Sequence, residues 1–235
     1  MATRESDDLP TLDVTSRGTK FVDNEGRTLT LRGVNLGGAK LPAGYRSDQS
    51  EEAGDDASYV GRPFPLSEAA EHLGRLRAWG FNIVRLSVTW DALEHEGPKQ
   101  YDHDYVQYVL DVVKACRTFG LYVYVDPHQD VWSRHCGGSG APAWTLEKVG
   151  LDHSKFKDTG AAVTHHDCSE QDPTQFPRMF WPTNMSRLAC LTMFTVFFGG
   201  ERFAPDLRVG DESMQHYLQR HYIDALSLLA AALRN

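Results

Sequence analysis

Polar side chains follow two apolar segments that have the composition of buried strands. Arg85 lies within residues 80–90, and His128 and Asp130 come directly after residues 121–126. Strands enclosed on both faces have near-continuous apolar sequences, and in a barrel of alternating strands and helices the groups at the carboxyl ends of the strands build the active site. A cation lowers the pKa of a neighbouring carboxylate. The sequence therefore places three candidate functional groups at strand ends.

Each of these residues also has a structural interpretation. Arg85 could form an ion pair at a strand end without taking part in chemistry, because structural ion pairs perturb charged groups as well. His128 and Asp130 could cap the turn after their strand, since both residue types tolerate turn geometry. Their position at the strand ends favours the functional interpretation.

Histidines and cysteines of the type that bind zinc occur in the second half of the chain. They are His135, Cys136, His165, His166 and Cys168. Because they lack the short paired spacings of structural zinc sites, we expect no metal.

The apolar patterns predict the elements that position the candidate groups. A small hairpin is expected at residues 19–31, and strands are expected at residues 31–36, 82–88 and 121–126. Helices are expected at residues 67–79, 102–119, 186–198 and 213–234. Ser67 and Asp102 are the expected N-caps of the first two helices.

The alternation of strands and helices predicts an α/β fold, a (β/α)8 TIM barrel with only about the first three βα units present. Residues 1–18 are expected to be a flexible N-terminal arm, and residues 19–235 the N-terminal part of the barrel. Residues 128–182 are expected to be a long irregular stretch, and loops of this length are usually functional or disordered.

Charge and cysteine content limit the class of protein. The 235 residues carry a net charge of -8 and show no basic stripe, so we expect no nucleic-acid partner. The four cysteines have no close pairing, and the first residues lack an apolar signal segment, which favours a cytoplasmic protein. The longest apolar stretch, residues 188–198, is shorter than the roughly 20 residues that span a bilayer. No transmembrane segment is therefore expected, while peripheral membrane contact stays open.

Three ordered motifs resemble those of glycoside hydrolase family 5. They are NEGR with LRGVNL at residues 24–27 and 31–36, GFNIVRL at residues 80–86, and DPHQD at residues 126–130. The His-Gln-Asp form is similar to the endoglycoceramidase-related branch. WPTN at residues 181–184 and FFGGERFAP at residues 197–205 resemble the fungal glucosylceramide and steryl glucoside hydrolases of that branch.

The resemblance implies a retaining β-glycosidase that uses two carboxylates about 5 Å apart, one as nucleophile and one as acid and then base. In the family these are glutamates after the fourth and seventh strands, and the acid/base follows an asparagine. No Asn-Glu-Pro occurs in the chain, so we expect both catalytic glutamates to be absent from it. No cofactor and no metal are implied.

The resemblance also implies supporting roles at the site. Arg85 matches the arginine that donates hydrogen bonds to the nucleophile, and His128 and Asp130 match groups that bind hydroxyls of the sugar. Lys40 matches a sugar-contacting lysine of the branch. Trp132 lies next to this motif and could stack on a sugar ring, although aromatic residues more often bury area in a core. The implied substrate is a glycolipid or another β-glucoside.

Glu94 and Glu96 are two carboxylates close together in the chain that could be taken for a catalytic pair. We expect both to be solvated surface residues, because the family places its carboxylates elsewhere. An alternative from another class also stays open: the chain could be a non-catalytic carbohydrate-binding remnant or an unproductive fragment.

Overall fold

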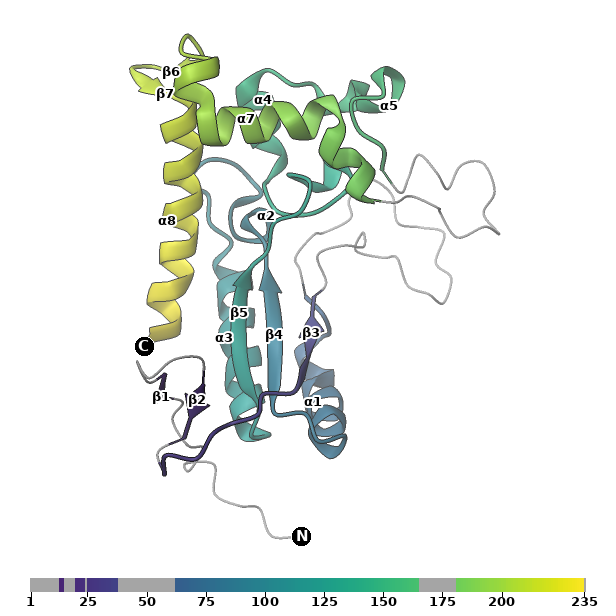
Figure 1. Cartoon of the computed structure of the whole chain (residues 1–235), viewed down its shortest axis with the longest axis vertical. Coiled ribbons are helices and arrows are strands. Elements are labelled where there is room, and N and C mark those ends of the chain that lie inside the picture. The colour runs from purple at the N-terminus through teal and green to yellow at the C-terminus, as the bar shows by residue number, and fades with distance from the viewer. Residues whose placement is uncertain (1–12, 15–19, 24, 38–61, 165–180, 235) are drawn as a thin grey trace, which may run out of the picture.

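A three-stranded parallel sheet lies at the centre of the computed structural model (Figure 1). The structure describes residues 13–14, 20–23, 25–37, 62–164 and 181–234. The strands are β3 (Gly33–Leu36), β4 (Ile83–Val88) and β5 (Tyr122–Pro127), in the order β3-β4-β5. The three strands expected from the sequence are confirmed to within one or two residues. Their carboxyl ends lie at the same edge of the sheet because all three run parallel.

Close contacts fix where β3 meets β4. A Cβ atom on Gly33 would lie 2.0 Å from the carbonyl oxygen of Ile83, so only glycine allows this approach. Asn82 joins the starts of the two strands: its Nδ2 donates to Thr30 O at 2.9 Å, and its Oδ1 accepts from the backbone N–H of Arg32 at 2.8 Å. These interactions set the register of the sheet.

Helices α1 (Ala69–Ala78) and α3 (His103–Thr118) contact one another, and α3 packs against β5. Asp102 caps α3 as expected, because its side chain accepts from the Tyr105 N–H at 2.7 Å. The expected cap at Ser67 is wrong. Ser67 lies inside the short 3-10 helix η1 (Leu66–Glu68), and no side chain caps the start of α1.

The chain between β5 and the C-terminal helices contains more regular structure than expected. The short elements there are η2 (Arg134–Cys136), α4 (Ala143–Val149), η3 (His153–Lys155), α5 (Phe156–Thr159) and η4 (Trp181–Ser186). Helix α2 (Trp90–Glu94) directly follows β4. These segments lie beyond the carboxyl ends of the strands in Figure 1.

The two long C-terminal helices confirm the prediction from helical spacing. Helix α7 (Leu188–Phe203) runs past its expected end, because the non-helical backbone at Gly199 kinks the helix without ending it. Strands β6 (Arg208–Val209) and β7 (Glu212–Ser213) form a short hairpin before α8 (Met214–Arg234).

The N-terminal hairpin is smaller than expected. Strand β2 (Phe21–Val22) returns through a bridge between Val22 and Thr28, and Gly26 adopts a positive φ of 76° in the turn. Strand β1 (Asp13–Val14) pairs with β2, so part of the expected N-terminal arm forms a strand. The other residues of that arm lie outside the described part.

Aromatic side chains link α8 to the segments above the sheet. Trp90 packs edge-on against Trp144 and Tyr222, with ring centroids 5.4 and 5.6 Å apart. Trp144 also meets His221 of α8, at 5.3 Å. Such contacts bury large area and hold the C-terminal helix against the carboxyl edge of the sheet.

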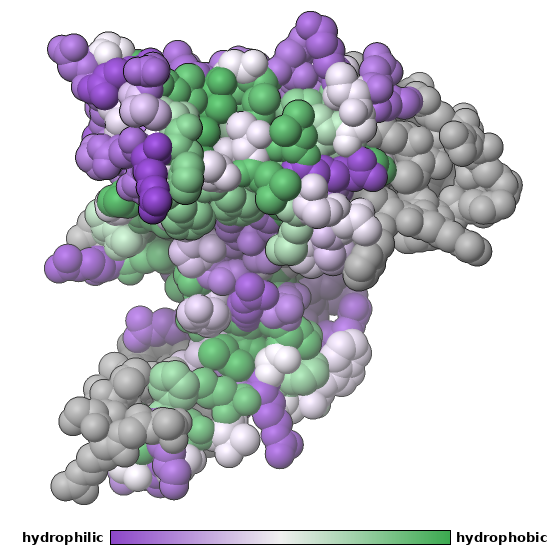
Figure 2. Space-filling model, turned by 45° about the horizontal axis from the view of Figure 1, so that its top comes forward, coloured by the Kyte–Doolittle hydropathy of each residue, from purple (hydrophilic) through white to green (hydrophobic). Residues whose placement is uncertain are grey.

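Figure 2 shows green, apolar surface around α7. Leu188, Leu191 and Phe198 are 64%, 52% and 69% exposed and share the outward side of this helix, while Met193 on its inward side is fully buried. None of the described helices is both long and apolar enough to cross a membrane.

Candidate active site

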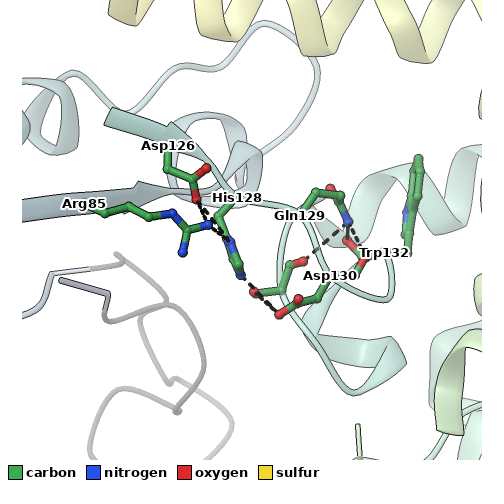
Figure 3. Close-up of polar contacts among 7 residues, drawn as sticks. Arg85, Asp126, His128, Gln129, Asp130 and Trp132 are labelled. Atoms are coloured by element: carbon green, nitrogen blue, oxygen red, sulfur yellow. Dashed lines mark hydrogen bonds and ion pairs between the residues drawn. The ribbon is translucent and has the colours of Figure 1, made fainter. Parts of the chain in front are cut away.

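Four ionisable side chains form a chain of contacts that leads from Arg85, in the middle of β4, to the carboxyl end of β5 and the residues after it (Figure 3). Arg85 Nη2 donates to Asp126 Oδ2 at 2.6 Å. His128 Nδ1 lies 3.3 Å from the same oxygen, and its Nε2 lies 3.2 Å from Asp130 Oδ2. The site therefore alternates cation, carboxylate, imidazole and carboxylate.

Strand alternation explains why these groups meet. Val84, Leu86 and Val88 of β4 are buried, so Arg85 projects from the opposite face of the strand. In the parallel pairing Arg85 is the partner of Tyr124, and Ser87 is the partner of Asp126. Partner residues project from the same face of a sheet, which brings Arg85 and Asp126 together. Tyr124 on this face is 56% exposed.

The pair of Arg85 and Asp126 is partly shielded from water. The Arg85 side chain is 36% exposed and that of Asp126 is 14% exposed. A charge-assisted hydrogen bond in such a setting is stronger than one between neutral groups. The bond fixes the position of the guanidinium relative to Asp126.

The imidazole of His128 is 15% exposed and lies between two carboxylates. In its neutral form it donates to one carboxylate, and in its charged form it donates to both. The backbone N–H of His128 donates to Val88 O at 2.8 Å, which continues the pairing of β4 with β5 past the end of the sheet. His128 is thus positioned by both backbone and side chain.

Asp130 is held by the segment around Ser139, where the chain folds back onto it. Its backbone N–H donates to Ser139 O at 2.8 Å, and Ser139 Oγ lies 3.3 Å from Asp130 Oδ2. Oδ2 thus accepts from Ser139 and also contacts His128 Nε2. The carboxylate is an oriented acceptor, suited to binding a hydroxyl group once a substrate competes for it.

The same returning segment is tied to the end of β4. The backbone N–H of Asp91 donates to Gly140 O at 2.7 Å. Burial raises the pKa of Asp91 to about 6, although Arg134 at 3.9 Å and His95 act to lower it. Because this pKa lies near neutrality, the charge on Asp91 changes with pH close to the site.

The structure brings together Arg85, His128 and Asp130, which the sequence had singled out. Lys40 lies outside the described residues. Trp132 is only 2% exposed, and its ring packs edge-on against Phe194 and Phe197, while its Nε1 donates to Thr145 Oγ1 at 2.9 Å. This burial corrects the expectation that Trp132 stacks on a sugar.

Sequence reasoning missed two groups that complete the site. Asp126 was treated as the last residue of an apolar strand, and its contacts with Arg85 and His128 make it the centre of the cluster. Gln129 donates from Nε2 to backbone carbonyl oxygens of the following turn. The polar residue that ends an apolar run was the available signal for Asp126.

Glu94 is not the solvated residue that the sequence predicted. It is fully buried, and its carboxylate accepts from Trp90 Nε1 at 2.6 Å and lies 2.9 Å from His221 Nδ1. Glu96 is exposed as expected, with 71% of its side chain accessible. The two residues therefore do not form a catalytic pair.

Among the described residues, no group of three or more His, Cys, Asp or Glu side chains could hold a metal ion. His165, His166 and Cys168 lie outside the described part. His135 stacks on His153 with ring centroids 4.0 Å apart. Burial, together with His153 and Arg134, lowers the pKa of His135 to about 3, so this ring is neutral at ordinary pH.

The parallel sheet, with ionisable groups gathered towards its carboxyl edge, is an arrangement found in α/β enzymes of the barrel class. Comparison with known families identifies the family: residues 38–165 match cellulase (glycosyl hydrolase family 5). The chain belongs to this family, whose fold is the TIM barrel, and the sheet is consistent with part of such a barrel.

Fungal glycosidases are among the relatives of this chain. It is 47% identical over 219 residues to a glucosylceramidase of Aspergillus fumigatus, a match that covers 91% of this chain and 28% of the relative. It is 41% identical to the ergosteryl-beta-glucosidase of Saccharomyces cerevisiae, covering 92% of this chain and 31% of the relative. The chain thus spans about a third of the length of these relatives.

Solved structures agree with this assignment. The crystal structure of Cryptococcus neoformans sterylglucosidase 1 with hit 1 superposes with a TM-score of 0.80 at 42% identity, covering 90% of this chain and 30% of that one. Endo-glycoceramidase II from Rhodococcus sp. shares the fold at 23% identity, with a TM-score of 0.58.

Proposed function

We propose that the chain contributes the N-terminal part of a retaining β-glycosidase that hydrolyses lipid glucosides such as glucosylceramide or steryl glucosides. The observation that carries the proposal is the contact chain of Arg85, Asp126, His128 and Asp130, which leads from the middle of β4 to the carboxyl edge of a family 5 sheet. This edge is where enzymes of the barrel class bind and transform their substrates.

Arg85 is proposed to support the nucleophile. The guanidinium has five N–H donors, and Asp126 accepts through a single oxygen in this structure. Further donors can therefore bind a second carboxylate, whose pKa the cation would lower. A charged carboxylate is the form that attacks the anomeric carbon.

His128 and Asp130 are proposed to hold the sugar. Both side chains are mostly buried and already oriented by their mutual contact. A hydroxyl of the glucose ring can donate to Asp130 Oδ2 and accept from His128 Nε2, so it can replace that contact without leaving either group unpaired. Lys40 and its sugar contact remain part of the proposal on the strength of the family motif alone.

The two catalytic glutamates are proposed to lie outside these 235 residues, with the chain supplying about the first three βα units. The consecutive strand order β3-β4-β5 and the exposed face at Tyr124 support this extent. The two carboxylates at the described site, Asp126 and Asp130, contact opposite nitrogens of one imidazole, which suits a supporting role. The relatives' threefold greater length provides room for the remaining strands.

The lipid end of the substrate is proposed from the relatives and from the surface. Two relatives are named for glucosylceramide and for ergosteryl glucoside. The outward residues of α7 supply exposed apolar area that suits peripheral contact with a membrane. A cytoplasmic location fits the three described cysteines, Cys116, Cys136 and Cys190, which are buried and unpaired.

Substitution at the site tests this function in the whole protein that carries the chain. Asp130→Asn and His128→Ala each remove a charge-assisted hydrogen bond of about 1.5–3 kcal/mol, which corresponds to about a 10- to 150-fold loss of kcat/KM for steryl glucoside hydrolysis. The exposed Glu96→Gln is the matched control and should retain full activity. Losses below threefold in both site variants would contradict the proposal.

A further inference from the structure

We infer that Gln129 is a positioning residue, whose carboxamide is seated against Gly140 and fixes the turn that aims Asp130 at His128. The inference rests on the proposed function, because it concerns the group proposed to bind the sugar. Figure 3 shows the amide facing the turn rather than the imidazole.

The amide nitrogen of Gln129 holds the turn through backbone carbonyl oxygens. Nε2 lies 2.7 Å from Trp132 O, 3.1 Å from Asp130 O and 3.4 Å from Ser139 O. An amide has two N–H donors, so it must share them among these three acceptors. One side chain therefore ties both ends of the loop that begins at Asp130 and returns at Ser139.

The turn that the amide holds is strained. Trp132 adopts a positive φ of 76°, a conformation that costs a residue with a side chain on the order of 1–3 kcal/mol. Its backbone N–H donates to Asp130 O at 2.7 Å, across only two residues, and its carbonyl oxygen also accepts from the Ala141 N–H at 2.7 Å. Strain of this kind persists only where surrounding contacts enforce it, and the Gln129 amide is one of these contacts.

Two glycines make room for this arrangement. Gly140 has a φ of 142°, and a Cβ atom there would lie 2.2 Å from Gln129 Oε1. A Cβ atom on Gly138 would lie 2.9 Å from the Cβ of Asp130. The returning segment thus packs directly on both Gln129 and Asp130, and the absence of side chains at Gly138 and Gly140 permits it.

Loss of the amide would release the carboxylate of Asp130. Its contact with His128 Nε2, at 3.2 Å, depends on a turn whose carbonyl oxygens would then lose their shared donor. A carboxylate in place of the amide would also repel these oxygens. Gln129 accordingly acts on the substrate through Asp130 and not by direct contact.

The test uses a double-mutant cycle in the whole protein. Gln129→Glu has the same size as the natural residue and lacks its donors, and we expect it to lower kcat/KM for steryl glucoside about 10-fold. In a background that already contains Asp130→Asn, the same change should lower kcat/KM less than twofold, because the group it positions is gone. If the two fold-losses of kcat/KM multiplied in the double variant, the inference would be overturned. Independent effects multiply in this way, as they would if Gln129→Glu caused only a general structural defect.

Two further variants guard against a failure to fold. Gln129→Asn retains the amide but is one methylene shorter, and it should show the same coupling to Asp130. Gly140→Ala meets Gln129 directly, and its control Gly150→Ala also lies at a positive φ, of 88°, but has open space around it. Only Gly140→Ala should reduce activity beyond what its change in melting temperature explains. Equal effects of the two alanine variants on activity would count against the proposed contact between Gly140 and the Gln129 amide.

A crystal structure of the Gln129→Glu or Gln129→Asn variant separates this inference from the proposed function. We expect the distance from Asp130 Oδ2 to His128 Nε2 to lengthen beyond 3.5 Å, the limit of a hydrogen bond. An unchanged distance would overturn the positioning role whatever the activity. A lengthened distance in a protein that hydrolyses no glucoside would retain the positioning role and reject the function.

Discussion

Replacement of Glu94 by leucine should destabilise the protein strongly, although the residue lies in a charged stretch of sequence. Its carboxylate is fully buried and accepts from Trp90 Nε1 and from the backbone N–H of Lys99. It also lies 2.9 Å from His221 Nδ1 on α8, which is 2% exposed. Leucine would leave these polar groups without their acceptor.

The expected loss follows from the burial of the pair. Removing one partner of a buried ionic or hydrogen-bonded pair costs about 3–5 kcal/mol, because the remaining group stays desolvated without compensation. Glu94→Gln should cost less, since the amide oxygen can still accept from Trp90. The exposed Glu96→Leu should change the free energy of unfolding by no more than about 0.5 kcal/mol.

Chemical denaturation followed by tryptophan fluorescence measures these changes. In a double-mutant cycle, Glu94→Leu and His221→Leu together should cost about 0.5–3 kcal/mol less than the sum of the single variants, because the two residues interact directly. A cost for Glu94→Leu no larger than that of Glu96→Leu would refute the buried arrangement. Strict additivity with His221→Leu would refute the contact between α2 and α8.

Three further predictions concern pH and helix capping. Burial raises the folded-state pKa of Asp91 to about 6, above its ordinary value of 3.8. Wild-type stability should therefore fall relative to Asp91→Asn by on the order of 3 kcal/mol as pH rises from about 4 through about 6, measured from denaturation midpoints at several pH values. Burial lowers the folded-state pKa of His135 to about 3, so the wild type should lose up to ~1.4 kcal/mol per pH unit relative to His135→Phe as pH falls below about 6.5, and parallel acid-denaturation curves would contradict this. Asp102→Ala should cost about 0.5–2 kcal/mol and Asp102→Asn much less, because asparagine also caps the Tyr105 N–H; equal melting temperatures for the two variants would contradict the cap.

Much of the fold could be predicted because its signals are local. The strands β4 and β5 are apolar runs that end in polar residues, and α3 has both a helical repeat and an Asp102 cap. Ser67 does not cap α1 because a 3-10 turn follows Pro65 and includes Ser67 before α1 begins. Whether a helix starts with such a turn depends on the segments that pack against it. Local patterns thus predict elements better than their boundaries.

The residues of the site also divide into those that a local sequence pattern predicts and those whose environment depends on distant segments. Arg85, His128 and Asp130 follow from the rule that strand ends carry function, which is a property of the sequence pattern. The burial of Glu94 depends on His221, which lies 127 residues further along the chain, and the burial of Trp132 depends on Phe194 and Phe197 of α7. Contacts between segments so far apart leave no periodic signal, so sequence reasoning assigned these residues to the wrong environment.

Glucose release by the short and the long chain decides whether the catalytic glutamates lie outside residues 1–235. Residues 1–235 and the whole protein that carries them would be assayed side by side on glucosylceramide and on a steryl glucoside. We predict release by the longer protein alone, because the two catalytic glutamates are proposed to lie outside these residues. Release by residues 1–235 would contradict this account and place the catalytic carboxylates within the chain, where Asp126 and Asp130 are the nearest candidates. An inactive longer protein that still binds glucosides would favour a carbohydrate-binding role instead.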